Sequence, residues 1–261
     1  MLLAVDIGNT NISLGVFNTD ETGEERYGPA ATWRIATEPE RMPDEYGLLL
    51  TDLLPLKGVS AAELRAVSIC SVVPPLTPAF VDVIRTYFHL EPLVVGAGVK
   101  TGVKVLYDNP RDVGADRIAD AAAALKLYGG PAIIVDFGTA TVFDAVSAES
   151  EYVGGAIAPG IEVAGDALFH RASQLRRVAL ERPETAIGKN TVHAMQSGLV
   201  LGFAEMVRGM VGRFDRELGG GAKVVATGGL AGLIQKEADI FDAVNPDLTL
   251  TGLRIIYELN T

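Results

Sequence analysis

Short apolar runs rich in β-branched residues recur along the chain, joined by polar turns or separated by amphipathic segments. Residues 2–17 read LLAVDIGNTNISLGVF, in which two such runs flank an Asp-x-Gly turn. This pattern predicts a β-hairpin, because glycine and small polar residues favour a tight turn between strands. In the rest of the first half, the pattern predicts strands at 31–36, 66–73 and 92–95, and helices at 43–56, 77–89 and 112–128.

The second half repeats this order of predicted elements. Residues 132–147 read AIIVDFGTATVFDAVS and predict a second hairpin with the same kind of turn. The elements expected after it are strands at 152–158, 223–227 and 240–244, and helices at 160–171, 191–218, 230–238 and 250–258. Strands and helices in this order form mixed sheets with helices packed on them. We therefore expect an α/β protein of two mixed-sheet domains that face a cleft.

The two hairpin sequences also resemble each other residue by residue. Aligned without gaps, Val5, Asp6, Gly8 and Val16 match Val135, Asp136, Gly138 and Val146. The offset of 130 residues is half the chain, which indicates two related halves. Because a glycine pair ends the helix predicted at 112–128, we expect the domains to span residues 1–129 and 130–261.

Composition narrows the classes of protein to which the chain can belong. Its 261 residues are 48% hydrophobic and 21% charged, which is typical of a folded globular chain. The net charge is -11 and no basic run interrupts it, so no nucleic-acid partner is expected. A single cysteine, Cys70, excludes a disulfide within the chain and, with three scattered histidines, makes a zinc site improbable. No signal peptide or membrane span is expected, so we predict a soluble cytoplasmic protein without a membrane partner.

The two predicted turns carry residues that suit phosphate binding. Gly8 lets backbone N–H groups approach a ligand, and Asp6, at the end of a buried strand, is a natural holder of hydrated magnesium. Small hydrogen-bonding residues surround them, namely Asn9, Thr10, Asn11 and Ser13, and the second turn offers Asp136, Gly138, Thr139 and Thr141. One such hairpin is more simply explained as an ordinary β-turn. The duplicated pair favours a site for the β- and γ-phosphates of a nucleotide.

A third glycine element, ATGGLAG at 226–232, follows a predicted strand. Paired glycines between a strand and a helix let a flat ligand such as an adenosine lie against the backbone, but they also suit a plain turn, and this element alone leaves both interpretations open. Other nucleotide signatures are absent. The chain has no Walker A motif and no G-x-G-x-x-G, and Ser197 lies outside any G-x-S-x-G elbow.

Two further segments carry expectations about packing. The long helix predicted at 191–218 contains glycines at positions 198, 202, 209 and 212, each of which costs about 1 kcal/mol of helix propensity against alanine. They indicate a close helix contact, either within the domain or across a dimer. The polar stretch 18–30 predicts a mobile loop whose charges form a solvated face.

Six motifs, in order over nearly the full length, resemble those of the type III pantothenate kinases. They are DIGNT at 6–10, YDNPRDVGADR at 107–117, VDFGTAT at 135–141, GGAIAPG at 154–160, GKNTVHAMQSG at 188–198 and ATGG at 226–229. The Asp-x-Gly hairpins alone indicate only the wider superfamily of sugar kinases, acetate kinase, heat-shock chaperones and actin, whereas N-P-x-x-x-G-x-D-R is much more specific. The resemblance implies the actin-like ATPase (ribonuclease H-like) fold, with duplicated domains facing a nucleotide cleft.

The resemblance also implies an activity and roles for individual residues. The activity is ATP-dependent phosphorylation of pantothenate to 4'-phosphopantothenate, the first step of coenzyme A synthesis. It would be carried out by a homodimer with magnesium and a monovalent cation, potassium or ammonium. Asp116 would be the general base, Asp136 would hold the monovalent cation, and Asp6 would help to place magnesium through water. The matching ATP-binding residues are Asp6, Ile7, Gly8, Asn9, Thr10, Asn11, Ile12, Ser13 and Thr139, and the substrate-binding residues are Tyr107, Gly114, Ala115, Asp116, Arg117 and Thr191.

The residues around Asp116 fit this role on chemical grounds as well. Asp116 falls at the start of a predicted helix, where backbone N–H groups and the helix dipole stabilise a carboxylate, so we expect a low pKa. Such a base suffices for phosphoryl transfer, because the proton leaves late. Arg117 would attract the carboxylate of pantothenate. Without the resemblance, helix capping by Asp116 and a surface ion pair of Arg117 explain these residues equally well.

The sequence departs from the family pattern at one place and leaves rival functions open. Ala172, Ser173 and Arg176 stand where the family usually has a threonine-alanine pair and a leucine-proline step, which puts the neighbouring substrate wall in doubt. One rival is a kinase for another small hydroxy acid or sugar. The other is a non-catalytic, ATP-binding accessory regulator that acts through a protein partner.

Overall fold

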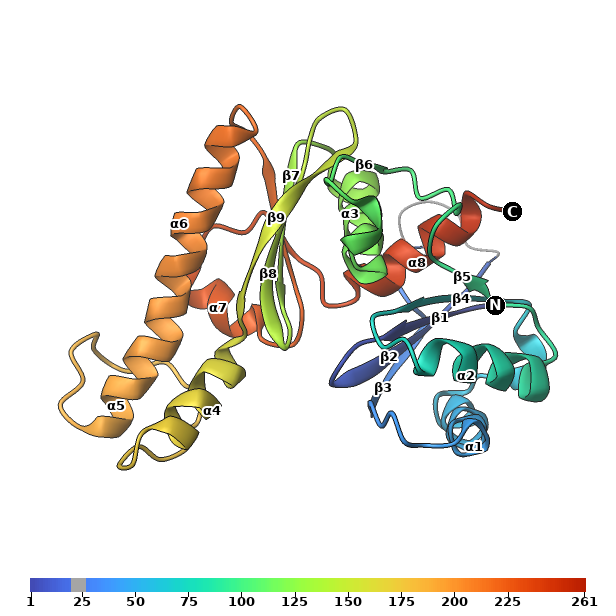
Figure 1. Ribbon diagram of the computed structural model, residues 1–261, viewed down its shortest axis with the longest axis horizontal. Coiled ribbons are helices and arrows are strands. Elements are labelled where there is room, and N and C mark those ends of the chain that lie inside the picture. The colour runs from blue at the N-terminus through green and yellow to red at the C-terminus, as the bar shows by residue number, and fades with distance from the viewer. Residues whose placement is uncertain (20–26) are drawn as a thin grey trace. The chain divides into compact units, whose positions relative to one another are not determined.

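The computed structural model describes residues 1–19 and 27–261, and it divides them into two compact units (Figure 1). Unit 1 comprises Met1–Ala123 and Asp247–Thr261, and unit 2 comprises Ala124–Pro246. Most of the loop expected at 18–30 lies outside the described residues. The units differ from the expected domains 1–129 and 130–261, because the last helix of the chain returns to the first unit.

Unit 1 is built on a five-stranded sheet with strand order β3-β2-β1-β4-β5. The strands are β1 (Leu2–Ile7), β2 (Asn11–Phe17), β3 (Ala31–Ala36), β4 (Ala66–Ser71) and β5 (Leu93–Val94). The first three pair antiparallel, and β4 and β5 extend the sheet in parallel from β1. The predicted hairpin and its third strand are therefore confirmed.

Helices cover both faces of the unit 1 sheet (Figure 1). On one face α1 (Pro43–Leu53) and α2 (Leu76–Val83) enclose a core in which the rings of Tyr46 and Phe80 lie 4.8 Å apart. On the other face lie the first turns of α3 (Ala115–Tyr128) and all of α8 (Leu248–Glu258). In β1, β2 and β4, residues of the two strand faces contact one core or the other, as the pleat of a strand requires.

Helix α8 fixes the position of α3 at close range. Gly252 of α8 lies against the backbone of Ala119, where a Cβ atom would collide with the carbonyl group. Beside it, the Thr249 hydroxyl donates a hydrogen bond of 2.7 Å to Asp120, whose carboxylate is buried. The last helix thus holds the first turns of α3 against the sheet, although it comes from the far end of the sequence.

Unit 2 repeats the plan of unit 1. Its strands are β7 (Ala132–Phe137), β8 (Ala140–Val146), β9 (Glu151–Pro159), β10 (Lys223–Thr227) and β11 (Ala243–Val244), and they follow the order β9-β8-β7-β10-β11. Its helices are α4 (Ile161–Arg171), α5 (Thr191–Gln196), α6 (Gly202–Glu217) and α7 (Ala231–Ala238). A π-helical turn, Ser197–Leu201, joins α5 to α6, so the long helix expected at 191–218 is present but irregular.

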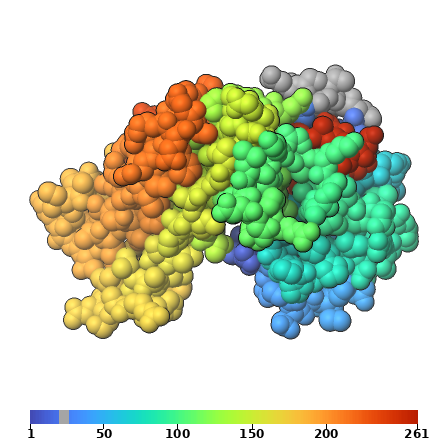
Figure 2. Space-filling model, turned by 45° about the horizontal axis from the view of Figure 1, so that its top comes forward, coloured from blue at the N-terminus to red at the C-terminus, as the bar shows by residue number. Residues whose placement is uncertain are grey.

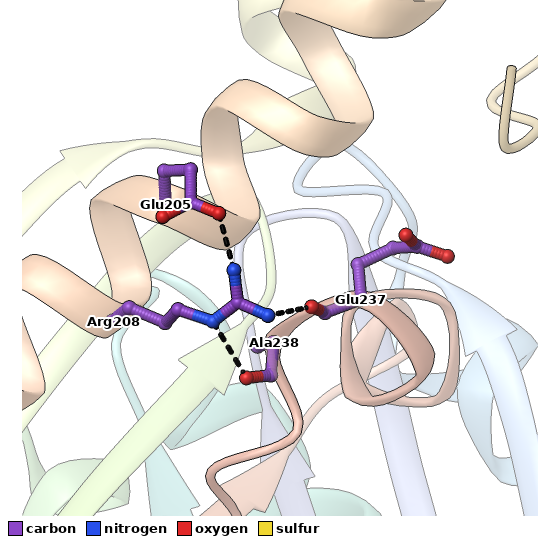
Figure 3. Close-up of polar contacts among 4 residues, drawn as sticks. All are labelled: Glu205, Arg208, Glu237 and Ala238. Atoms are coloured by element: carbon purple, nitrogen blue, oxygen red, sulfur yellow. Dashed lines mark hydrogen bonds and ion pairs between the residues drawn. The ribbon is translucent and has the colours of Figure 1, made fainter. Parts of the chain in front are cut away.

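Arg208 of α6 anchors the C-terminal end of α7 (Figure 3). Its guanidinium donates to the carbonyl oxygens of Ala238, at 2.8 Å, and Glu237, and it also pairs with Glu205 on its own helix. Carbonyl groups at a helix end lack partners within the helix, so a cation there satisfies them. This contact holds α7, which follows the ATGG segment, onto α6.

The two hairpins have the same burial but differ by one residue in the turn. Strands β1 and β7 show identical patterns of buried and half-buried positions, and in both the aspartate is half-buried. Ile7 pairs with Ile12 in the first hairpin, whereas Phe137 pairs with Thr141 in the second. The second turn is therefore one residue shorter. The ungapped match of Val16 to Val146 is wrong, because the strand position equivalent to Val16 is occupied by Ala145.

Other differences from the expectations are small. The helix predicted at 43–56 ends in a 3-10 turn, Leu54–Lys57. The helix predicted at 77–89 ends in a π-helical turn, Ile84–Phe88. A two-residue strand, β6 (Lys104–Val105), was not expected. A close helix contact within the domain is not found at the glycines predicted to make one. Among the described residues, a Cβ atom at Gly198, Gly202 or Gly209 would meet nothing within 4 Å outside its own helix backbone.

Candidate active site

The tip of the first hairpin is held in place by its own backbone and by the end of β3. The Gly8 N–H donates to the Asn11 carbonyl oxygen at 3.0 Å. Thr37, just after β3, donates its hydroxyl to the Gly8 carbonyl at 2.6 Å and its N–H to the Thr10 carbonyl at 3.0 Å. These contacts fix the turn while Asn9, Thr10 and Asn11 remain exposed to solvent.

The predicted ATP-binding segment divides into core and surface positions. Ile7 and Ile12 are fully buried in the unit 1 core, so only their backbone atoms could face a ligand. Asp6 and Ser13 are half-buried on the opposite face of the sheet. A ligand at this hairpin would therefore contact the polar members of the segment.

Asp6 belongs to a row of polar side chains that crosses the sheet. It pairs with Ser13 of β2, which in turn pairs with Arg34 of β3, and on its other side it pairs with Cys70 of β4. Residues that pair across neighbouring strands share a face, so these four side chains lie side by side. The buried Cys70 thiol donates a hydrogen bond of 3.2 Å to the Asp6 carboxylate.

Asp116 approaches this row from the first turn of α3. Its Oδ1 atom accepts a hydrogen bond of 2.8 Å from the N–H of Arg117. The carboxylate lies directly over Gly114, where a Cβ atom would collide with Oδ1 and would also contact a methyl group of Val72. Glycine at 114 is thus required by the position of the Asp116 carboxylate.

Burial changes the protonation of both carboxylates, and the charge of Asp116 adds to the effect at Asp6. Burial, and then the charge of Asp116, raise the pKa of Asp6 from its ordinary 3.8 to about 7, although the Cys70 thiol and the charge of Arg34 oppose this. Burial likewise raises the pKa of Asp116 and outweighs the Arg117 N–H and the Arg117 charge, which lower it. The expected low pKa of Asp116 is therefore wrong. The helix N-terminus acts in the expected direction, but loss of water costs more.

The remaining residues of the predicted substrate segment lie next to Asp116 in the chain. Gly114, Ala115 and Arg117 are half-buried around the start of α3, and Tyr107 is half-buried before it. Between them, Asn109 caps a short 3-10 turn by accepting from the Arg111 N–H at 3.3 Å and donating to Asp112 at 2.8 Å. The N-P-x-x-x-G-x-D-R motif therefore folds into one cap, turn and helix start.

In unit 2 the second hairpin places Asp136 at the equivalent strand position. Thr227 of β10 pairs with Asp136 just as Cys70 pairs with Asp6. Gly228 follows with φ +88°, a left-handed conformation that favours glycine, and a Cβ atom there would collide with the Asp136 carboxylate. The ATGG segment therefore closes against Asp136, a contact that sequence reasoning did not predict.

Thr139 and Thr191 occupy two other places in unit 2. Thr139 is exposed at the tip of the second hairpin, and its carbonyl accepts a 3.0 Å hydrogen bond from the N–H of Gly160. Thr191 is the exposed first residue of α5, behind Asn190, whose side chain accepts from the His193 N–H at 2.9 Å. It lines a surface pocket of about 710 Å³ between α4 and α5, together with Leu168, Leu175, Lys189 and Met195.

The structure adds four residues to the predicted site: Arg34, Thr37, Cys70 and Gly228. Cys70 is a small core residue whose thiol also contacts Asp6. Strand register reveals Arg34 and Cys70, and no local sequence signal marks either one. Gly228 could have been suspected from the glycine pair, although its partner could not.

Among residues 1–19 and 27–261, no group of three or more His, Cys, Asp or Glu side chains is arranged to hold a metal ion. Within unit 1, the aspartates at 6 and 116 nevertheless form a partly buried acidic pair. Magnesium in nucleotide sites is commonly held by one or two carboxylates, with the phosphates and water completing its shell. The residues present fit such an ion better than one that needs a cage of protein ligands.

In the same described ranges, no helix is long and apolar enough to cross a membrane. The duplicated mixed-sheet arrangement, with an Asp-x-Gly hairpin opening each sheet, is the fold of the actin-like ATPases and sugar kinases. The solved structure of an inorganic polyphosphate/ATP-glucomannokinase from Arthrobacter sp. strain KM shares this fold, with a TM-score of 0.50 and 12% identity over 100% of this chain and 99% of that one. A Campylobacter jejuni protein described as a Baf family transcriptional activator superposes with a TM-score of 0.62 and 18% identity, covering 99% and 98% of the two chains.

Comparison of sequences identifies the family. The model of the type III pantothenate kinases matches residues 2–213. A type III pantothenate kinase from Moorella thermoacetica is 53% identical over 261 residues, which is 100% of both chains. The chain therefore belongs to the type III pantothenate kinases, and it is an enzyme of the kinase class.

The raised pKa of Asp6 predicts that the ligand-free protein loses stability between about pH 4 and pH 7. In this range the folded state keeps the Asp6 proton while the unfolded state releases it, so a rise in pH favours unfolding. Asp6→Asn should remove this component, which amounts to at most roughly 4 kcal/mol for a shift of about three units. Urea unfolding of both proteins at several pH values measures it, and equal pH dependence in the two would contradict the assignment.

Proposed function

We propose that the protein catalyses the ATP-dependent phosphorylation of pantothenate to 4'-phosphopantothenate, the first step of coenzyme A synthesis. The observation that carries this proposal is the approach of Asp116 to Asp6 within unit 1, which joins the motif typical of the family to the phosphate-binding hairpin. Membership of the type III pantothenate kinases supports the choice of substrate.

Asp116 is the general base in this proposal. Its carboxylate is half-buried and held by one backbone hydrogen bond, so it is oriented and still able to take a proton. Because burial raises its pKa, it is a stronger base than an exposed aspartate. Phosphoryl transfer proceeds through a loose transition state, in which the base orients the hydroxyl and accepts its proton late.

The polar residues of the first hairpin bind the ATP phosphates, and Thr139 of the second hairpin provides a further ATP contact. Tyr107, Gly114, Ala115, Arg117 and Thr191 contact pantothenate, with the Arg117 guanidinium pairing with its carboxylate. Asp6 helps to hold magnesium through water, and the ion supplies charge neutralisation on the phosphate oxygens when it is bound. In the ligand-free protein, the unfavourable charge between Asp6 and Asp116 favours an incoming cation at this place.

A substrate panel with matched variants tests the proposal. With ATP, magnesium and potassium, pantothenate should be phosphorylated, while other small hydroxy acids and sugars should not. Asp116→Asn should lower kcat by about 100-fold or more, because the general base is lost, and leave the KM for ATP little changed. Asp82→Asn, an exposed carboxylate on α2, is the control and should keep full turnover.

Each rival gives a different result in this panel. Turnover of a different hydroxy acid or sugar would identify a kinase of other specificity. ATP binding without turnover of any substrate would favour a regulator. Normal turnover by the Asp116→Asn enzyme would remove this residue from the mechanism.

Asp136 holds the monovalent cation in our proposal. It is half-buried at the end of β7, with Gly228 packed against it and Thr227 as its strand neighbour, so its surroundings are tight and polar. We expect the enzyme to work faster in potassium or ammonium than in sodium, and Asp136→Ala to abolish that difference. Equal rates in potassium and sodium for the unaltered enzyme would rule out the role.

We further propose that the protein is a homodimer of the cytoplasm. Figure 2 shows α4 and the segment after it (yellow to orange) at the surface of unit 2. This unit exposes several large apolar side chains, namely Val153, Ile157, Val163, Leu168, Phe169, Ile187 and Val192. Where such side chains form a contiguous patch, they mark an interaction surface. The α6 glycines without neighbours suit the approach of a second copy.

Sedimentation equilibrium tests the dimer. We expect twice the 27.5 kDa mass of the chain, and Ile157→Glu should shift the population toward the monomer. A monomer at micromolar concentration would contradict the proposal. Fractionation of cells that produce the protein tests its place in the cytoplasm, and recovery with the membranes would contradict it.

A further inference from the structure

The acidic site of unit 1 needs positive charge to receive an anionic nucleotide. The protein carries a net charge of -11, and Asp6 and Asp116 add local negative charge at the point where the phosphates would bind. Arg117 beside Asp116 is assigned to the substrate carboxylate in the proposed function. Cations other than a bound metal must therefore come from a neighbouring element.

Arg34 is the cation that the fold brings to this place. It pairs with Ser13, and Ser13 pairs with Asp6, so the Arg34 side chain leaves the sheet on the same face as both. Its neighbours in the strand confirm this direction, because Trp33 and Ile35 pack into the core on the opposite face. Arg34 itself is exposed.

The strand that carries Arg34 is tied to the phosphate-binding turn. Thr37, three residues further on, makes both hydrogen bonds that fix Gly8 and Thr10. Arg34 is therefore held at a constant distance from the tip of the hairpin. Within the described ranges, the Arg34 guanidinium has no hydrogen bond or ion pair. Lys57, near the same strand, instead donates a hydrogen bond to the Thr32 carbonyl oxygen and lies over the Trp33 ring.

We propose that Arg34 is a nucleotide-binding residue whose guanidinium contacts the phosphates of the bound nucleotide. A guanidinium suits this role because its planar fork of donors matches two phosphate oxygens at once. In the free protein Arg34 faces two carboxylates, since its charge lowers the pKa of Asp6 and of Asp247 at the start of α8, against the effect of burial on both. The assignment rests on the proposed function, because it takes the first hairpin as the nucleotide site.

A second explanation is that Arg34 only balances the negative charge of Asp6 and Asp247 in the free protein. The two roles differ in what they do to ligands that carry different numbers of phosphates. A residue that contacts the phosphates affects ADP strongly and adenosine not at all. A residue that only balances charge in the free protein changes the affinity for both ADP and adenosine, or for neither.

Calorimetric titration of the full chain with ADP, AMP and adenosine in the presence of magnesium separates these roles. Arg34→Gln should weaken ADP binding by about 10-fold or more, because a charged hydrogen-bonding contact is lost, and leave adenosine binding unchanged. Arg34→Lys should lie between the two, since it keeps the charge but not the fork. Arg65→Gln is the control, because Arg65 is an exposed arginine of the same unit that precedes β4, at the end of the sheet where β1 begins. Thermal unfolding of each variant confirms that it is folded.

The outcomes are distinct. Unchanged ADP affinity in Arg34→Gln, or an equal loss for adenosine and ADP, would each overturn the inference while leaving the proposed kinase activity intact. Failure of the unaltered protein to bind ADP would overturn the proposed nucleotide site, and this inference with it. A selective loss for ADP, reproduced in a raised KM for ATP, supports it.

Discussion

The candidate site of unit 1 is governed by one unfavourable interaction, between the charges of the buried carboxylates of Asp6 and Asp116. Burial disfavours charge on both groups, and the charge of Asp116 adds to this at Asp6, so the pKa of Asp6 rises to about 7. The surrounding contacts hold the pair together in spite of this cost. The Cys70 thiol and the Arg117 N–H each donate to one carboxylate, and Gly114 leaves room for Asp116.

Packing contacts away from the two carboxylates keep Asp116 near Asp6. Asp116 can approach the sheet only because α3 lies close to it, and α3 is held there by α8 through Gly252 and the Thr249–Asp120 hydrogen bond. The last helix therefore belongs to unit 1, although it follows unit 2 in the sequence. An unfavourable arrangement of this kind persists because the rest of the structure over-determines the geometry.

Much of the fold could be predicted from the sequence, because the alternation of apolar residues and the glycines at turns are features of short segments. Strands such as Ala31–Ala36 and Lys223–Thr227 were expected at the residues where they occur. The return of α8 to unit 1 was not expected, because the repeat indicated a domain boundary at the middle of the chain. The local sequence of a helix does not determine which sheet the helix covers. The register of the second hairpin was also missed, because removing one residue from a turn leaves the apolar pattern of its strand unchanged.

The candidate site was predictable in its residue types and less so in its electrostatics. Motifs placed Asp6 and Asp116 correctly on a hairpin and a helix start, where their local surroundings suggested ionised carboxylates. The raised pKa of Asp116 comes from tertiary burial, which a helix N-terminus cannot reveal. Arg34 and Cys70 entered the site through strand pairing alone, and pairing partners lie too far apart in sequence to be found by spacing.

The most direct test of this account is the titration of the Asp6 side chain by carbon-detected NMR in the ligand-free protein and in its Asp116→Asn variant. The account predicts a pKa of about 7 for Asp6 in the unaltered protein. In the variant the pKa should fall, because the neighbouring charge is gone, yet stay above its ordinary value, because burial remains. A pKa for Asp6 near 4 in the unaltered protein, or one that does not change in the variant, would contradict the opposition of the two carboxylates.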